Sequence, residues 1–242
     1  MKTSIDEIKG IILSINEYKE YDSIVKMITE NKIIDFIAKG VLKQTSKNRM
    51  LCQPFSYVSL QLTHTSFPVL ITGNVIQSYY KISQDLMNQA ICNCLCDLLL
   101  HTEIDLNLFH LFDQVLHRFH IDDKKKYTLA CMFIKDILIK DGFSMHVNDC
   151  ILCHTKKNLE TISIKDGGFL CHNCNQGKYK KMHKDELIQY YSLFQYKVEK
   201  SEEFINYYTF SFDQMFYLME WYCLHEQIHL KSFQFLQEIR YL

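Results

Sequence analysis

The sequence predicts an α+β protein: a β-rich N-terminal part, then a helical part that carries a zinc finger. Three observations predict this. Apolar and polar residues alternate within the first eighty residues, apolar residues then recur at helical spacing, and two C-x-x-C pairs interrupt the helical half. We therefore expect a β domain at residues 1–80 and a helical domain at residues 81–242, with a zinc-finger insertion at about 147–178.

The N-terminal strands are predicted from a hydrophobic period of two. This period is present at residues 11–15, 24–28 and 58–62. Asn31 and Lys32 separate two such runs and are expected to form a tight turn. Several short strands without an intervening helix favour a small barrel or a sandwich.

The helices are predicted from apolar residues that share one face. Ser83 is read as the N-cap of the first helix, with Asp85 in its first turn. Three helical stripes then follow, formed by Leu86, Ala90, Ile91, Leu95, Leu98 and Leu99; by Leu106, Phe109, Phe112, Leu116 and Phe119; and by Ala130, Phe133, Ile134, Ile137 and Leu138. Two more helices are expected beyond the cysteine pairs, at about 185–196 and from Ser211.

The two C-x-x-C pairs are the most informative motif. Cys150 and Cys153 form the first pair, Cys171 and Cys174 form the second, and seventeen residues lie between them. Four thiolates in this spacing are typical of a closed tetrahedral zinc site, which has no open position for a substrate. We expect one structural Zn²⁺ per chain. A disulfide pair and four unrelated cysteines are the alternatives, and the histidines that follow Cys153 and Cys171 are read as exposed knuckle residues.

Composition limits the function classes. The chain has 242 residues and a formal net charge of -1, so binding to nucleic acid would have to come from local charge asymmetry. No stretch approaches eighteen apolar residues, which excludes a membrane helix. Ten cysteines without a signal peptide indicate a reducing cytosol, so we expect a cytoplasmic protein.

A basic stretch lies between Ala38 and Pro54. It contains Lys39, Lys43, Lys47 and Arg49 and no acidic residue. Glycine and hydroxyl-bearing residues interleave with these cations, which suits contact with phosphate oxygens. Phe55 and Tyr57 follow, and their rings are predicted to stack on bases. The alternative is a solvated loop whose lysines maintain solubility.

A second basic stretch follows the second cysteine pair. Lys178, Lys180 and Lys181, with Lys184 beyond them, precede the next acidic residue. The first three are predicted to contact DNA. The alternative is a polar face that leads into the next helix.

The string His225-Glu226-Gln227-Ile228-His229 spells H-E-x-x-H. On a helix its two histidines would share a zinc ion, with the glutamate as general base, as in a metalloprotease. Against this, the thirteen residues after His229 contain no further histidine ligand. The six cysteines outside the pairs are read as small buried hydrophobic residues, namely Cys52, Cys92, Cys94, Cys96, Cys131 and Cys223. The chain shows no Gly-rich phosphate loop, no G-x-S-x-G and no paired acid/base carboxylates, so we expect no enzymatic activity.

The chain resembles the bacterial DNA repair and recombination family RecO over nearly its full length. The N-terminal resemblance is carried by Gly10-Ile11-Ile12-Leu13, Tyr18, Glu20, Asp22, Thr29-Glu30, Lys32-Ile33, Ala38-Lys39-Gly40, Ser46 and Gln53-Pro54-Phe55-Ser56. The cysteine pairs match those members that carry a zinc finger. The C-terminal resemblance is carried by Leu224-His225 and Leu230-Lys231-Ser232-x-x-Phe235-Leu236, which look like the closing helices of the family.

The resemblance implies an N-terminal OB-fold barrel joined to a helical domain that bears the zinc site. It also implies a protein that binds single- and double-stranded DNA, anneals complementary strands, and acts with RecR to place RecA on DNA coated by single-stranded-DNA-binding protein at the nucleoid. Lys39 matches the basic residue of the family's A-K-G motif, whereas Leu42 stands where many members have arginine. Two alternatives stay open: a zinc metalloprotease, and a zinc-stapled interaction adaptor without strong DNA binding.

Overall fold

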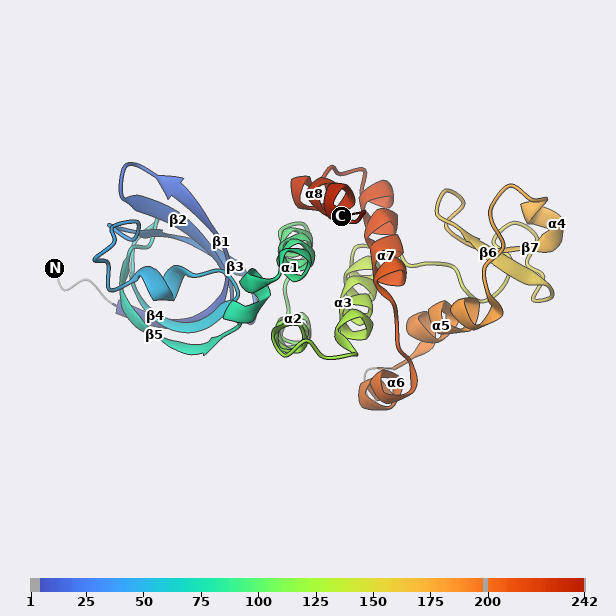
Figure 1. Ribbon diagram of the computed structural model, residues 1–242, viewed down its shortest axis with the longest axis horizontal. Helices are drawn as coiled ribbons and strands as arrows, with labels where there is room; N and C mark the ends of the chain where they lie inside the picture. Colours follow the sequence, from blue (N-terminus) through green and yellow to red (C-terminus); the bar gives the residue numbers. More distant parts are fainter. Residues whose placement is uncertain (1–4, 198–199, 242) are drawn as a thin grey trace. The chain divides into compact units, whose positions relative to one another are not determined.

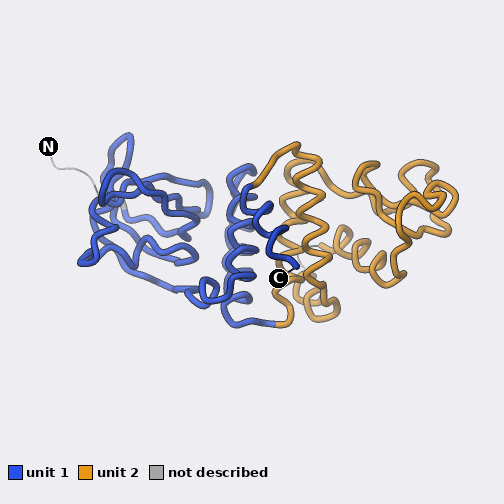
Figure 2. The backbone as a smooth tube through the Cα atoms, turned by 45° about the horizontal axis from the view of Figure 1, so that its top comes forward, with its two compact units in different colours: residues 1–123, 231–242 blue, residues 124–230 orange. Residues whose placement is uncertain are grey.

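The computed structural model describes residues 5–197 and 200–241. The chain divides into two compact units, one made of residues 1–123 and 231–242 and the other of residues 124–230 (Figure 2). This is not the same division as the predicted domains at 1–80 and 81–242, which stay a prediction. Residues 1–4, 198–199 and 242 of those domains lie outside the described part of the chain.

The first unit begins with five antiparallel strands that curl into a barrel (Figure 1). They are β1 (Ile5–Tyr18), β2 (Asp22–Ile28), β3 (Ile33–Ala38), β4 (Ser56–Thr63) and β5 (Leu70–Ser78), in the sheet order β3-β2-β1-β4-β5. The predicted turn at Asn31 and Lys32 is confirmed, because β2 pairs with β3 across it and the Thr29 N–H donates to the Lys32 carbonyl at 2.8 Å.

The sheet closes through a short parallel contact between its two edges. Ile37 in β3 bridges to Val69 just before β5, and the Ile37 N–H donates to the Pro68 carbonyl at 2.9 Å. Inside lies a core of alternating inward side chains, which includes Ile12, Val25 and Phe36, all fully buried. The strand alternation in the sequence therefore corresponds to a barrel with one buried face, and the expected OB-like fold is confirmed.

Close backbone packing in the barrel depends on Gly10. A Cβ added there would lie 2.3 Å from the Ile28 carbonyl oxygen, well inside van der Waals contact. Gly10 precedes a register shift in β1 between Ile12 and Ser14. A strand interrupted in this way bends, and the bend lets a five-stranded sheet close on itself.

Helical elements complete the first unit. They are the 3₁₀ turns η1 (Arg49–Cys52) and η2 (Tyr80–Gln84) and the helices α1 (Leu86–Leu99), α2 (Leu106–His120) and α8 (Lys231–Ile239). Asp85 caps α1, since its carboxylate accepts from the Asn88 N–H at 2.7 Å, whereas Ser83 lies inside η2. The predicted N-cap at Ser83 was therefore wrong by two residues. The chain first forms the 3₁₀ turn η2, which contains Ser83, and the α-helix begins only after it.

The second unit contains the remaining helices and a small hairpin. Helix α3 (Lys126–Lys140) packs against α7 (Phe212–His225), while α5 (Lys184–Gln195) and α6 (Ser201–Tyr207) lie between them in sequence. Ser211 caps α7 as part of a capping box with Gln214. The hairpin is formed by β6 (Leu159–Ser163) and β7 (Gly168–Cys171) and leads into the short helix α4 (His172–Asn175). Within the described ranges, no helix has the length and apolar character needed to span a bilayer.

Candidate metal centre and nucleic-acid surfaces

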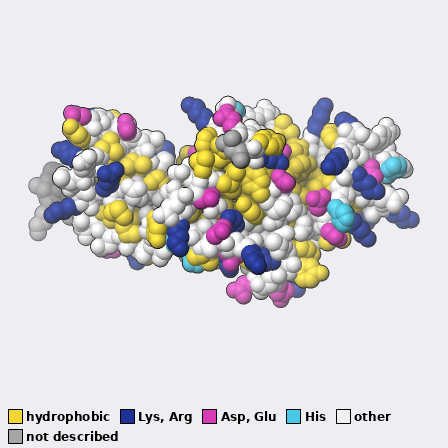
Figure 3. All heavy atoms as spheres, in the orientation of Figure 1, with side chains coloured by type: hydrophobic (Ala, Val, Ile, Leu, Met, Phe, Trp, Pro, Cys, Tyr) yellow, Lys and Arg dark blue, Asp and Glu magenta, His cyan; other side chains and the backbone are white. Residues whose placement is uncertain are grey.

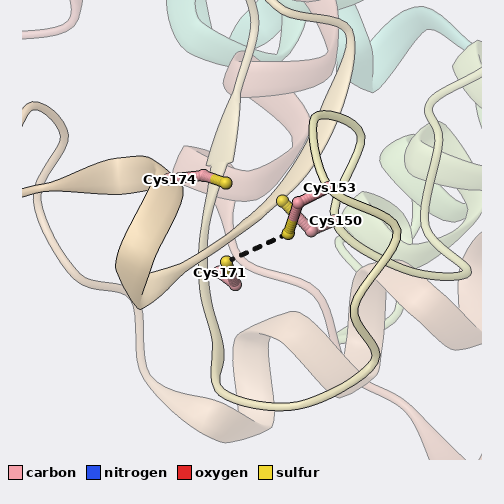
Figure 4. A group of neighbouring side chains, drawn as sticks. All are labelled: Cys150, Cys153, Cys171 and Cys174. Carbon is pink, nitrogen blue, oxygen red and sulfur yellow. Dashed lines mark hydrogen bonds between the residues drawn. The ribbon is translucent and has the colours of Figure 1, made fainter.

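The four paired cysteines come together around one point. Cys150 and Cys153 arrive on the loop that precedes β6, Cys171 is the last residue of β7, and Cys174 lies in α4. Their side chains point toward one another (Figure 4), and all four sulfur atoms lie within 4.8 Å of one another. Cys153 and Cys171 are the partners of the contact drawn in the figure, at 3.6 Å. Residues distant in sequence thus form one compact set of sulfur donors.

Tight backbone turns place each pair. In the first turn the His154 N–H donates to the Cys150 carbonyl at 2.8 Å, and His154 itself has a φ of 59°. In the second, the Gln176 N–H donates to the His172 carbonyl, and Gln176 and Gly177 both adopt positive φ. Positive φ reverses the chain within two residues after each pair, so each pair lies in a tight turn.

Backbone N–H groups also set the charge state of the first sulfur. Burial favours the neutral thiol of Cys150, but hydrogen bonds from the backbone N–H groups of Cys171, Cys153 and Leu152 outweigh it and lower its pKa to about 6. The hydrogen bond with Cys153, followed by burial, raises the pKa of Cys174 to about 12. The cluster therefore favours one thiolate that accepts hydrogen bonds from its neighbours, and a bound cation would supply the charge that the other sulfurs need to ionise.

Two carboxylates support the cysteine turns from outside. Asp149 precedes Cys150 and contacts His146 Nε2 at 2.8 Å and His154 Nδ1 at 3.4 Å. Hydrogen bonds from these histidines lower the pKa of Asp149, with His146 the largest cause. The sequence alone gave no reason to single out this carboxylate, because its partners are set by the turn and not by a motif.

Glu160 supports the second turn. Its carboxylate accepts from Asn175 Nδ2 at 2.9 Å and contacts His172 Nδ1 at 3.1 Å. The hydrogen bond from Asn175 is the largest cause that lowers the pKa of Glu160. Asn175 is itself buried and bonded to the Tyr179 backbone through both ends of its amide, at 2.9 and 2.8 Å. The second cysteine turn is therefore linked to the basic stretch that follows it.

The donor set fits a metal ion. Among residues 5–197 and 200–241, the four cysteines are the group of metal-binding side chains close enough to share an ion. Four sulfurs of this kind suit a soft or borderline cation in tetrahedral geometry. His154 and His172 are exposed and contact Asp149 and Glu160, outside the set of sulfur atoms.

On the barrel, Lys39 and Lys43 line a common hollow of about 470 Å³. Gly40, between them, has a φ of 61° and donates its N–H to Asp22 Oδ1 at 2.8 Å. The other lining residues come from the β1–β2 turn and include Lys19, Tyr21 and the acidic Glu20 and Asp22. The hollow is thus cationic on the side of the Lys39 loop and acidic on part of the opposite side.

Lys47 and Arg49 lie farther along the same loop. Both are exposed, and neither is among the residues that line the hollow. Arg49 begins η1, and its neighbour Asn48 donates to the Ile71 carbonyl of β5 at 3.3 Å. The structure therefore brings two of the four predicted cations together and places the other two just before or at the start of η1.

Phe55 and Tyr57 were both predicted to stack on bases, but only Tyr57 is partly exposed. Phe55 is only 1% exposed, with its N–H bonded to the Ile12 carbonyl, so its ring belongs to the core and offers no face to a base. That assignment was wrong because Phe55 lies in the turn just before β4, where its backbone adopts a φ of 61° and its side chain is packed inside. Tyr57 is half-buried and meets Phe109 edge to face at a centroid distance of 5.9 Å.

Tyr21 is an aromatic residue at the hollow that the sequence reasoning missed. Its ring is 44% exposed and carries the Lys43 ammonium at 5.2 Å from its centroid. A hydrogen bond to Glu20 is the main cause that raises the pKa of Tyr21. A signal was available: Tyr21 and Lys19 lie in the turn between the first two alternating runs, beside the strand that pairs with residues 33–38.

The second basic stretch lies directly after α4. Lys178, Lys180 and Lys181 are all exposed. The Lys178 ammonium lies 4.8 Å from the Tyr179 ring centroid, and the Lys180 carbonyl accepts from Thr161 Oγ1 at 2.9 Å. Figure 3 shows Lys and Arg side chains gathered over the part of the second unit that carries β6, β7 and α4. The stretch is held against β6 by its backbone, which leaves its ammonium groups in solvent.

The H-E-x-x-H string does not form the helical arrangement that a protease site needs. Helix α7 ends at His225, and Gln227 has a φ of 57°. The Ile228 N–H then bonds back to the Cys223 carbonyl, so that His229 follows a reversal of the chain. His225 Nε2 contacts the Ile164 carbonyl at 2.9 Å. The two histidines therefore do not lie one turn apart on a helix.

The cysteines outside the pairs are placed largely as predicted. Cys52, Cys92, Cys94, Cys96 and Cys131 are buried, and Cys223 is half-buried. Burial raises the pKa of Cys52 to about 12 and that of Cys223 to about 11. High thiol pKa values go with structural rather than reactive cysteines, so these side chains are part of the packing.

An OB-like barrel joined to helices and a four-cysteine cluster defines the class of protein to which this chain belongs. Two family models match it: "Recombination protein O N terminal" over residues 1–79 and "Recombination protein O C terminal" over residues 83–201. The chain is a member of the RecO family.

Curated relatives agree with this assignment. The DNA repair protein RecO of Bacillus velezensis is 30% identical over 171 residues, which cover 69% of this chain and 67% of the relative. The RecO proteins of Bacillus subtilis and Bacillus pumilus are 29% and 28% identical over the same coverage. Membership makes the chain a DNA repair and recombination mediator, in a family that is not known for catalysis.

Proposed function

We propose that this protein binds single- and double-stranded DNA, anneals complementary strands, and with RecR helps load RecA onto DNA coated by single-stranded-DNA-binding protein. The proposal places it in the cytoplasm, at the nucleoid. The observation that carries it is the pair Lys39 and Lys43, exposed together at one barrel hollow in a chain of a DNA repair family.

The chemistry of the hollow supports contact with a DNA backbone. Lysine ammonium groups neutralise phosphates and release counterions, which supplies affinity without reading sequence. The exposed Tyr21 ring beside Lys43 adds a surface on which a base can stack. Neutralising two backbones lowers the repulsion that opposes annealing, while base pairing supplies the driving force.

Acidic neighbours limit the strength of this site. Glu20 and Asp22 line the same hollow, although Asp22 is engaged with the Gly40 N–H. Leu42, which stands where the resemblance leads us to expect a basic residue, is partly buried and packs against the barrel core. The barrel is therefore a weak binder by itself, and Lys47, Arg49 and the basic stretch at Lys178, Lys180 and Lys181 are proposed to extend it.

The cysteine cluster is proposed to hold one structural Zn²⁺ through Cys150, Cys153, Cys171 and Cys174. Its support is the tetrad of sulfur atoms within 4.8 Å of one another. Four protein ligands saturate a tetrahedral ion, so it would hold the turns together without taking part in a reaction.

The test is strand annealing with the Lys39→Glu/Lys43→Glu variant. Loss of two phosphate contacts lowers the salt slope for single strands by about 1.4, and we expect annealing of coated complementary strands to be abolished. Lys9→Glu/Lys32→Glu is the matched control, because both lysines are exposed on the barrel and line a different hollow. Equal annealing by both variants and the wild type would refute the placement of the site.

A further inference from the structure

A groove of about 670 Å³ lies beside the cysteine cluster in the second unit. One wall is the loop around the first cysteine turn, which contributes Asn148 and Lys156. The other wall is the chain from Lys181 into α5, which contributes Lys184 and Tyr191. The strands β6 and β7 supply the floor between them through Leu159, Glu160 and Phe169.

The groove is cationic. Lys156, Lys181 and Lys184 line it and are all exposed. Glu160 is the only carboxylate among its lining residues, and it is buried and engaged with His172 and Asn175. The lining therefore carries three ammonium groups against one carboxylate, which leaves the groove with a net positive charge.

Helix α5 presents cationic and aromatic side chains to the groove from one face. Lys184, Ile188 and Tyr191 are separated by four and three positions, which places them on one stripe of the helix. Ile188 is 42% exposed and Tyr191 is 44% exposed, although neighbouring Leu187 is buried. An exposed ring in the same groove as several ammonium groups is the combination by which proteins hold a single strand, with cations along the backbone and a flat face under a base.

The walls are fixed by hydrogen bonds. The Met182 N–H donates to the Glu160 carbonyl at 2.9 Å, and the Lys180 carbonyl accepts from Thr161, so Lys181 is held between two anchored neighbours. On the opposite side, Gln195 Nε2 donates to Asn148 Oδ1 at 2.9 Å and ties the first wall to the end of α5. The groove is therefore formed in advance of binding, which lowers the entropy lost when a ligand enters.

We propose that this groove is a second binding site for single-stranded nucleic acid, with Lys156, Lys181 and Lys184 on the phosphates and Tyr191 under a base. The inference rests on the proposed function and deepens it, because annealing needs a protein to hold more than one strand. An acidic peptide shares the charge complementarity. The exposed ring that shares the groove with the cations favours a strand, because a strand offers bases as well as phosphates.

The first test reverses the charge of the groove. Lys156→Glu/Lys184→Glu is compared with Lys165→Glu, a lysine of the same segment that is exposed but does not line the groove. Binding of a labelled oligo-dT by the full chain is followed by fluorescence anisotropy, in the wild-type background and in the Lys39→Glu/Lys43→Glu background. We expect the groove variant to bind about tenfold more weakly in both backgrounds, with a smaller salt slope, and Lys165→Glu to bind within about twofold of its parent.

The second test isolates the ring. Tyr191→Ala should weaken oligo-dT binding about tenfold and leave binding of an abasic strand unchanged, because stacking needs a base. Tyr207→Ala is the control, since that ring is 80% exposed on α6 and does not line the groove. Circular dichroism and zinc content confirm that each variant is folded.

The outcomes separate the two proposals. Unchanged oligo-dT binding by Lys156→Glu/Lys184→Glu overturns the groove site. If Lys39→Glu/Lys43→Glu still loses annealing, the proposed function stands without it. Absence of any oligonucleotide binding by the wild type overturns both. A labelled Asp-rich peptide that binds the wild type, loses binding in the groove variant and is not displaced by oligo-dT would assign the groove to a protein partner instead.

Discussion

The barrel and the cysteine segment (residues 147–178) differ in what stabilises their folds. Among the residues whose side chains are described, the barrel buries a core of twelve, including Phe36 and Leu60, with four further apolar side chains packed against it. The cysteine segment has a cluster of three buried residues, Cys150, Leu170 and Cys171, and two of these are sulfur donors. The first region is stabilised by removing apolar surface from water, whereas the second has too little of it.

The difference explains why the two regions look unlike each other in sequence. A structure with a full core needs regular alternation, because each inward position is filled by an apolar side chain. A structure held by a metal needs only its ligands at the correct spacing and turns that aim them, so the rest of the segment is free to be basic and polar.

Removal of the proposed zinc ion should produce the largest effect. Zinc binding in small modules is worth about 10–16 kcal/mol, and that free energy is also folding free energy. In chelator, or in Cys174→Ser, we expect backbone amides at 147–182 to lose protection against hydrogen exchange while β1, β2 and β4 keep theirs. Retained protection at 147–182 in metal-free protein would show that packing alone holds the segment.

Truncation of a side chain in the barrel core should have the second largest effect. Phe36→Ala empties a fully buried ring position and is expected to destabilise the barrel by about 3–5 kcal/mol. Denaturant unfolding gives the value, with Ile76→Ala as the exposed control. The zinc content of the variant should stay at one per chain. If Phe36→Ala also lost its metal, the cysteine segment would depend on the barrel core and would not be stabilised separately.

A change in the packing of the backbone should have a smaller effect on the free energy of unfolding. Gly10→Ala places a methyl group 2.3 Å from the Ile28 carbonyl oxygen, so β1 and β2 must separate locally, at about 1–3 kcal/mol. Thr72→Ala, at an exposed site of β5, is the control. Equal unfolding midpoints for the two variants would contradict the close approach.

The smallest expected effect lies at the link between the cysteine turn and the basic stretch. Asn175→Ala removes its hydrogen bonds to Glu160 and Tyr179 and is expected to weaken the segment by about 1–2 kcal/mol. Hydrogen exchange at 178–182 should quicken although zinc content is retained. Unaltered exchange there would indicate that the stretch is held by β6 alone.

Strands and helices were predicted well where one hydrophobic period, of two or of 3.6 residues, continued along the whole element. The strands at 22–28 and 56–63 and the helices at 106–120 and 126–140 follow directly from spacing. The first helix cap was misplaced because Ser83 and Asp85 are both competent caps, and only the 3₁₀ turn before the helix distinguishes them. Helix α6 was missed because a seven-residue helix is too short to show a period.

The candidate sites were predictable to the extent that they are local. The cysteine tetrad is defined by spacing, and Lys39 and Lys43 lie four positions apart in a single loop. The place of Tyr21 at the hollow depends on strand register. Ser23 pairs with Ala38, and this brings Tyr21 and Asp22 opposite Lys39 and Gly40. The wall of the groove at Lys156 depends on how two loops fold around the cysteines, which no linear pattern records.

The return of α8 to the first unit has a consequence for biosynthesis. Ser232 in α8 donates a hydrogen bond to Asp97 in α1, across 135 positions of sequence. As the polypeptide leaves the ribosome, the face of α1 that α8 covers must wait for the whole second unit to be translated. During that interval its apolar side chains are exposed to chaperones and to neighbouring nascent chains, so slow decoding between codons 124 and 230 would lengthen the period of greatest vulnerability to aggregation.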